Sequence, residues 1–152
     1  MQNWKRIVTI VLVLALLSCN MVFVNATNQG SEILYFNDGS YMIVTLKTGM
    51  SRAGNTISAD KIYTYYNAFD IEQWSATLSA SFTFDGTEYW TTSSNVSVDI
   101  TNSNWYVISK SASMSGCGAT ADVTMGNKVM GITIDRQSVT LTLSCSPYGV
   151  IS

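Results

Sequence analysis

The clearest pattern in the chain is an alternation of apolar and hydroxyl side chains from residue 74 to residue 84. Trp, Ala, Leu and Phe occupy every second position, and Ser or Thr fills each position between them. Successive side chains of a β-strand point to opposite faces, so a period of two predicts a strand with one buried face. Asp85-Gly86 follows directly and predicts a turn.

Shorter segments with related patterns predict further strands. They cover residues 33–36, 41–46, 61–66, 96–100, 105–113 and 139–145. The first two flank Asn37-Asp38-Gly39-Ser40, which is a typical hairpin sequence. Other predicted turns lie at 67–70, 101–104, 116–118, 126–127 and 135–136. Beyond residue 27 no segment has a convincing helical period.

These segments together predict an all-β protein. We expect an antiparallel β-sandwich of eight or nine short strands, Ig-like in size, with a small barrel as the alternative. One alternating face per strand favours antiparallel pairing, with apolar side chains inside and Ser or Thr outside. Residues 48–60 are predicted to be the one long irregular segment, either a connector or a binding loop. Without a repeat or a linker, residues 27–152 are predicted to form a single β domain.

The segment from residue 1 to residue 26 has the parts of a secretory signal peptide. Lys5 and Arg6 supply a basic start, and residues 7–17 are apolar except for one Thr. Val24 and Ala26 then suit the positions that precede a signal peptidase cleavage site. The pattern therefore predicts export of the protein.

Cleavage is expected between Ala26 and Thr27, which makes the mature protein secreted and extracellular, with no integral membrane span. The alternative is lipidation of Cys19, which ends a Leu-Leu-Ser-Cys sequence and would produce a membrane-anchored lipoprotein. A third possibility is an uncleaved anchor over residues 7–24, a stretch whose length is at the lower limit for a membrane span.

Composition narrows the classes of function. The chain has no His and only 3 Cys, which excludes His-dependent triads, His-ligated metals and sites that need four thiolates. It has 8 Lys+Arg against 10 Asp+Glu, and the basic residues are scattered. This charge balance argues against a nucleic-acid partner.

No group of residues predicts a catalytic, cofactor or metal site. The acidic pairs Asp70/Glu72 and Asp85/Glu88 lie in or beside predicted turns, where solvation and capping explain them better than glycosidase chemistry does. Lys110 lies between two serines, but alternation along a strand points it away from both. We therefore predict a protein that is not an enzyme and needs no cofactor.

Aromatic side chains are weak candidates for ligand binding. Trp74, Phe82 and Phe84 lie on the apolar stripe and are expected in the core. Tyr89 and Trp90 follow a turn, among Thr and Ser residues. Adjacent strand residues face opposite ways, so at least one of these two rings is expected to be exposed, where it could stack on a sugar or pack on a partner. The alternative is that they cover an edge strand or enter the core.

Five segments carry a resemblance to a family: LYFNDGSY at 34–41, YTYYN at 63–67, WSATL at 74–78, SKSAS at 109–113 and VTLTLSCS at 139–146. Together they resemble small secreted proteins of Gram-positive gut bacteria, of the Firmicutes type. The resemblance runs over nearly all of the mature chain. It implies export and a single compact domain, and it brings no assigned activity.

The leading hypothesis for function is a secreted, non-enzymatic binding module, envelope-associated or extracellular, with a cell-envelope component or a glycan as partner. The alternative is a secreted effector or bacteriocin-like toxin. That alternative rests on the alternation over residues 74–84, which could also line a membrane hairpin.

Cys117 and Cys145 are predicted not to be bonded to each other. The apolar phase changes from odd to even positions across Gly126-Asn127, which predicts a hairpin turn, and a second turn is predicted at Asp135-Arg136. Two turns would leave the cysteines at opposite edges of a sheet, beyond the reach of about 7 Å that a disulfide allows between Cα atoms. If Gly126 instead marks a bulge in one long strand, the last strand returns to Cys117 and a bond becomes possible.

Overall fold

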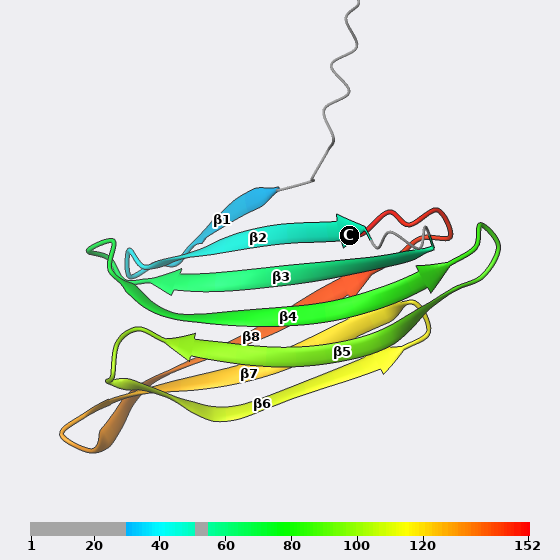
Figure 1. Cartoon of the computed structure of the whole chain (residues 1–152). Helices are drawn as coiled ribbons and strands as arrows, with labels where there is room; N and C mark the ends of the chain where they lie inside the picture. The colour runs from blue at the N-terminus through cyan, green and yellow to red at the C-terminus, as the bar shows by residue number, and fades with distance from the viewer. Residues whose placement is uncertain (1–29, 51–54) are drawn as a thin grey trace, which may run out of the picture.

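The structure, a computed structural model, describes residues 30–50 and 55–152, which form eight β-strands and no helix (Figure 1). The first sheet contains β1 (Ser31–Tyr35), β2 (Tyr41–Met50), β3 (Thr56–Tyr66), β4 (Glu72–Phe84) and β5 (Tyr89–Ile100) in that order. The second sheet contains β6 (Trp105–Ser115), β7 (Gly118–Val129) and β8 (Ile132–Ser144). All neighbouring strands are antiparallel, and the strands form two sheets rather than a closed barrel. The predicted β-sandwich is confirmed.

The core lies between the two sheets, and β4 supplies its centre. Trp74, Leu78 and Phe82 are fully buried, as the alternation along this strand predicts. From the second sheet, Val123 and Leu141 complete the same cluster. Full burial of each large apolar side chain stabilises the fold by about 1.5–3 kcal/mol.

Two of the predicted turns are confirmed in detail. In the β1–β2 turn Gly39 has a φ of +83°, and the Asp38 carboxylate accepts hydrogen bonds from the Ser40 amide at 3.0 Å and hydroxyl at 2.6 Å. In the β4–β5 turn Gly86 has a φ of +94°, and the Asp85 carboxylate accepts from three donors further along the turn. Glycine adopts such positive φ angles without the steric cost that other residues have.

The prediction of a long irregular segment over residues 48–60 is wrong at both of its ends. β2 continues to Met50 and β3 begins at Thr56, with the cross-strand pairs Thr48–Ala59 and Met50–Ile57. Ile57 and Ala59 are buried on the core face. Only two apolar residues, one large and one small, alternate with polar ones here. A pattern of that length does not stand out in the sequence. Residues 51–54 lie outside the described residues.

The predicted turns at Gly126-Asn127 and Asp135-Arg136 are also wrong, because β7 and β8 pass straight through these positions as paired strands. The turn between them lies at Met130-Gly131, where φ is +52° and +81°. Two successive positive φ angles are typical of a type I′ hairpin turn. The register shifts between Asn127 and Lys128, so a bulge produces the change of phase that the sequence displays.

Gly126 has a packing role rather than a turning role. A Cβ atom at this position would lie 2.7 Å from the ring of Tyr106, so only glycine lets that ring cross the strand. The Tyr106 hydroxyl shares a hydrogen bond of 2.7 Å with the Thr133 hydroxyl, and the Lys128 ammonium lies 5.1 Å from the ring centroid. The sequence alternative is correct in that the strand continues past Gly126, but the irregularity lies between Asn127 and Lys128 rather than at Gly126.

The predicted separation of Cys117 from Cys145 is therefore wrong. The last pair between β7 and β8 is Gly118–Ser144, and beyond it the Cys145 amide donates to the Cys117 carbonyl at 3.1 Å. Both cysteines are free thiols in the structure.

The predicted signal peptide over residues 1–26, its cleavage between Ala26 and Thr27, and the alternative lipidation of Cys19 all lie outside the described residues. In the part of the chain that the structure describes, no helix has the length and apolar character to cross a membrane.

Candidate functional site

Three tyrosines from three neighbouring strands form a continuous aromatic surface. Tyr35 on β1 pairs with Tyr41 on β2, which in turn pairs with Tyr66 on β3. The rings of Tyr41 and Tyr66 are stacked, with centroids 5.0 Å apart and planes at 8°, and the Tyr35 ring lies 5.8 Å from Tyr41. We call these three residues the tyrosine row.

The tyrosine row lies on the outer face of the first sheet, away from the second sheet. Its strand neighbours Met42 and Tyr65 are buried in the core. Since successive strand residues face opposite ways, Tyr41 and Tyr66 point outward. Tyr35 is 75% exposed, because β1 is an edge strand without burial on either face.

A carboxylate borders the middle of the tyrosine row. Asp70 lies in the β3–β4 turn, where its φ of +59° is held by the Asn67 side chain, which accepts from the amides of Phe69 and Ile71 at 3.0 and 3.1 Å. The pKa of Tyr41 is raised, first by desolvation and then by the charge and the acceptor oxygen of Asp70. The Tyr41 hydroxyl and the Asp70 carboxylate therefore form a polar rim beside the tyrosine rings.

Two further carboxylates belong to the same end of the sheet. The β1–β2 turn packs on the β3–β4 turn, since a Cβ on Gly39 would lie 3.3 Å from that of Ala68. The pKa of Asp38 is lowered by the hydroxyl and amide of Ser40. Glu72 pairs directly with Tyr66, and its carboxylate accepts from the Thr101 hydroxyl at 2.9 Å. The tyrosine row therefore has an acidic border.

The rest of this outer face is rich in hydroxyl groups. Between the core residues of β4 the outward positions are Ser or Thr at 75, 77, 79, 81 and 83, each half-buried. Ser58 and Ser81 share a hydrogen bond of 3.2 Å between their hydroxyls across β3 and β4. The face therefore combines aromatic rings at one end with small polar side chains along its length.

The sequence candidates Tyr89 and Trp90 lie elsewhere. Both are exposed, at 37% and 42%, as the sequence led us to expect for at least one of them. Trp90 pairs with Thr83, which is eleven residues along β4 from Glu72, or about 35 Å at the rise of a strand. The structure therefore does not bring these two rings together with the tyrosine row.

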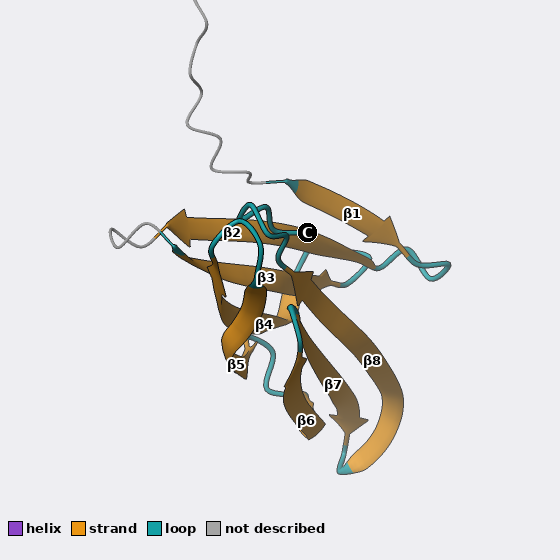
Figure 2. Ribbon diagram, turned by 90° about the vertical axis from the view of Figure 1, so that its right-hand side faces the viewer, coloured by secondary structure: helices purple, strands orange, loops and turns teal. Residues whose placement is uncertain are grey.

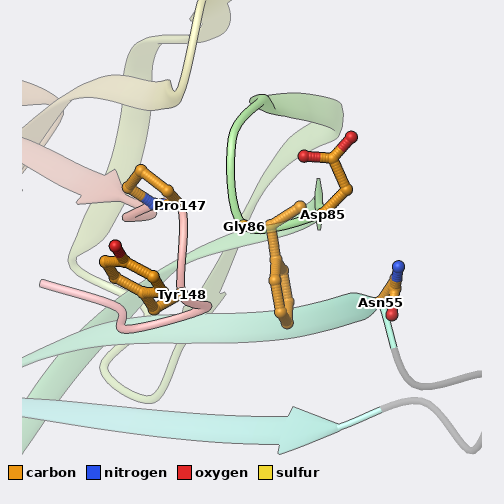
Figure 3. A pocket seen from close by; sticks show the side chains of 6 residues that line it. Asn55, Asp85, Gly86, Pro147 and Tyr148 are labelled. Atoms are coloured by element: carbon orange, nitrogen blue, oxygen red, sulfur yellow. The ribbon is translucent and has the colours of Figure 1, made fainter.

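An open pocket of about 290 Å³ lies at the Trp90 end of the sandwich (Figure 3). It is lined by Asn55, Phe84, Asp85, Gly86, Pro147 and Tyr148. Figure 3 shows Pro147 and Tyr148, from the C-terminal segment, opposite Asn55 and Asp85. The Gly86 amide donates to the Pro147 carbonyl at 3.2 Å, which ties the C-terminal segment to the β4–β5 turn.

The carboxylate that lines this pocket stabilises the β4–β5 turn. The pKa of Asp85 is lowered because the amides of Glu88 and Thr87 and the Thr87 hydroxyl donate to its carboxylate. A carboxylate held in this way serves the turn and is a poor proton acceptor. Gly149 completes the packing, since a Cβ there would lie 2.5 Å from the Phe84 ring.

The acidic pairs do not meet in a cleft. Asp70 and Glu72 lie at the start of β4, whereas Asp85 and Glu88 lie beyond its end. Among residues 30–50 and 55–152, no three His, Cys, Asp or Glu side chains gather closely enough to hold a metal ion.

Sequence reasoning missed the tyrosine row, although a partial signal was present. Tyr35 and Tyr41 lie on either side of the predicted hairpin turn, which brings them close together, but their direct pairing is set by the register between β1 and β2. Tyr66 joins them only through the register between β2 and β3, which the sequence does not reveal.

The fold is an antiparallel β-sandwich, and the outer face of its first sheet carries a row of one exposed and two half-buried tyrosines. No known family model, curated protein or solved structure matches the chain.

Proposed function

We propose that the protein is a secreted, non-enzymatic module that binds a glycan of the cell envelope or of the extracellular surroundings through the tyrosine row. The observation that carries this proposal is the alignment of Tyr35, Tyr41 and Tyr66 on the outer face of the first sheet. All three rings face away from the core, and Tyr35, which is 75% exposed, leaves aromatic surface open to a ligand.

The geometry of the row suits a sugar chain. Neighbouring strands lie about 4.8 Å apart, so the rings follow one another at roughly the length of one sugar ring. The C–H groups on the face of a sugar can pack on an aromatic ring, while its hydroxyls bond to polar groups at the rim. Tyr41 and Tyr66 stack on each other and so hold each other in place, and the exposed Tyr35 ring beside them is the part of the row on which a sugar would pack.

The border of the row narrows the ligand class. The carboxylates of Asp38, Asp70 and Glu72 can accept hydrogen bonds from sugar hydroxyls. Their negative charge disfavours an anionic polysaccharide. We therefore propose a neutral glycan or one that carries amino groups.

Export of the protein is supported by the signal-peptide pattern of residues 1–26 and by the resemblance to small secreted proteins. The non-enzymatic character is supported by the position of the acidic side chains: Asp85 accepts hydrogen bonds within the β4–β5 turn, at the opposite end of β4 from Asp70 and Glu72.

The test is retention of the purified protein on insoluble cell-wall and host glycans, followed by titration with soluble fragments of those that retain it. Tyr35→Ala should weaken binding at least tenfold, because it removes an exposed ring without disturbing the core. Trp90→Ala, which removes another exposed aromatic side chain far from the row, is the control and should leave affinity unchanged. Retention by none of the glycans, or sensitivity to Trp90 alone, would reject the proposal.

A second candidate, a secreted effector that acts on membranes, is supported by a different surface. The β7–β8 turn carries Met130 at 98% exposure, followed by Ile132 at 69%. An apolar tip of this kind can enter the interface of a bilayer. The alternating apolar residues of β4, which in the sequence suggest a membrane hairpin, are buried in the core. The apolar tip of the β7–β8 hairpin is therefore the feature that supports an effector.

This candidate is tested by leakage from liposomes and by growth inhibition of Gram-positive indicator strains. Activity that disappears in Met130→Asp would favour the effector. Absence of both effects would exclude it.

A further inference from the structure

The two cysteines of the described residues lie at the base of the same hairpin. Cys117 is in the tight turn between β6 and β7, where Ser115 pairs with Gly118. Cys145 follows the end of β8, and its amide donates to the Cys117 carbonyl at 3.1 Å. Cys145 therefore lies opposite Cys117, one step beyond the last strand pair, and opposite residues of antiparallel strands have Cα atoms about 4.5–5.5 Å apart, which is within the range of disulfides.

The surroundings of the two thiols support the same conclusion. Cys145 is buried and belongs to the core, in phase with Leu143 two residues before it. Cys117 is half-buried. The pKa of Cys145 is raised by burial and also by the negative charge of the Cys117 thiolate, an effect that requires the two side chains to be near each other.

We infer that Cys117 and Cys145 form an intramolecular disulfide when the protein meets a disulfide oxidant such as oxidised glutathione, and that this bond locks the base of the β7–β8 hairpin. The inference is independent of the proposed glycan binding.

The reaction is two successive thiol–disulfide exchanges. The Cys117 thiolate, as the more accessible one, attacks one sulfur of the oxidant, whose S–S bond breaks and releases one thiolate. The Cys145 thiolate then attacks the Cys117 sulfur of this mixed disulfide, and the second half of the oxidant leaves as a thiolate. In total the protein loses two protons and two electrons, and the oxidant is reduced to two thiols.

The position of the bond explains what it would stabilise. The Thr91 amide of β5 donates to the Gly116 carbonyl at 2.8 Å, and Cys145 forms an isolated bridge with Ile151. The first sheet, the β6–β7 turn and the C-terminal segment therefore meet at this point. A covalent link here closes the loop that β7 and β8 form between the two cysteines, which lowers the entropy of the unfolded chain.

Peptide mapping tests the bond directly. The full chain is incubated with oxidised glutathione, denatured, alkylated and digested with trypsin without reduction. Cleavage after Lys110, Lys128 and Arg136 puts Cys117 in peptide 111–128 and Cys145 in peptide 137–152. We expect these two peptides to be linked, and to separate on reduction. The Cys19→Ser variant should yield the same link, because it removes the third thiol.

Three other products would overturn the inference: two alkylated cysteines, a glutathione on each cysteine, or a link between the Cys117 residues of two molecules. Thermal unfolding tests the locking role. The oxidised protein should unfold about 10 °C above the reduced one, and Cys117→Ser should abolish that difference. A linked peptide without a rise in unfolding temperature would overturn the role in locking the hairpin.

Discussion

β4 and the β7–β8 hairpin consist of strands of 12 or 13 residues, yet they differ in how they are covered. β4 is paired on both sides, and its apolar face is covered by the second sheet from Trp74 to Phe82. The hairpin is covered only near its base. Its tip projects away from the first sheet (Figure 2). There the apolar side chains Val129, Ile132 and Ile134 are exposed.

The difference in cover between β4 and the hairpin shows what a period of two in the sequence indicates. An alternation of apolar and polar residues indicates that one face of the strand is covered by another layer. Formation of the strand itself requires only backbone pairing with a neighbouring strand. Where the hairpin leaves the sandwich, nothing selects one apolar face, so the phase can change at a bulge. From the sequence alone this change of phase predicts a turn, whereas the backbone continues as a strand to Val129.

The largest expected effect compares one aliphatic residue from each region. Leu78→Ala should lower the free energy of unfolding by about 2–5 kcal/mol, because it leaves a cavity in the covered part of the sandwich. Ile134→Ala should change the free energy of unfolding only slightly, since that side chain is exposed and its loss leaves no cavity. Urea unfolding measures both.

Thr77→Ala, an outward neighbour of Leu78, is the control for the face assignment and should cost far less than Leu78→Ala. Similar losses at residues 78 and 134 would contradict the idea that only one of the regions is covered.

The next effect compares two glutamines. The buried Gln73 side chain accepts from Trp105 at 3.2 Å and Asn102 at 2.7 Å, and donates to the Ile71 carbonyl at 2.8 Å. Gln73→Leu should cost about 1–3 kcal/mol, because it leaves a buried indole N–H and an amide without partners. Gln137→Leu in β8 loses only a bond of 3.4 Å and should be nearly neutral in the same urea titration. Equal costs would mean that the hairpin is as well covered as β4.

A smaller effect probes the packing of Gly126, which lies next to the bulge. Gly126→Ala should cost about 1 kcal/mol, because the Tyr106 ring must move and lose its hydrogen bond to Thr133. In a Tyr106→Ala background the same substitution should cost less, which a double-mutant cycle measures. An unchanged cost in that background would show that Gly126 is needed for its backbone conformation, as a turn would require.

The smallest expected effect is the loss of stability of two turns at low pH. In the folded protein the pKa values of Asp38 and Asp85 are below the ordinary value of 3.8, owing to the hydrogen bonds that their turns donate. Their contribution to stability is therefore present above that value and is lost as pH falls through the folded pKa. As pH falls below about 3, protection from amide exchange, corrected for the intrinsic rate at each pH, should be lost first in the β1–β2 and β4–β5 turns. An equal loss of protection at the Met130-Gly131 turn, which contains no carboxylate, would contradict this assignment.

The sequence by itself determined the elements whose causes are local. The β4 strand follows from its own alternation, and the β1–β2 and β4–β5 turns follow from a carboxylate and a glycine within a few residues of each other. Such features require no knowledge of distant partners, so the fold class could be predicted from them.

Only the tertiary structure decided the features that depend on register between strands. Tyr66 joins Tyr35 and Tyr41 through the pairing of β2 with β3. Gly126 is required by the ring of Tyr106, which lies on the neighbouring strand β6. Cys145 lies beside Cys117 because β7 and β8 each run unbroken to the Met130-Gly131 turn. The physical reason is the same throughout: a local pattern shows which face a residue takes, whereas register selects the residue opposite it.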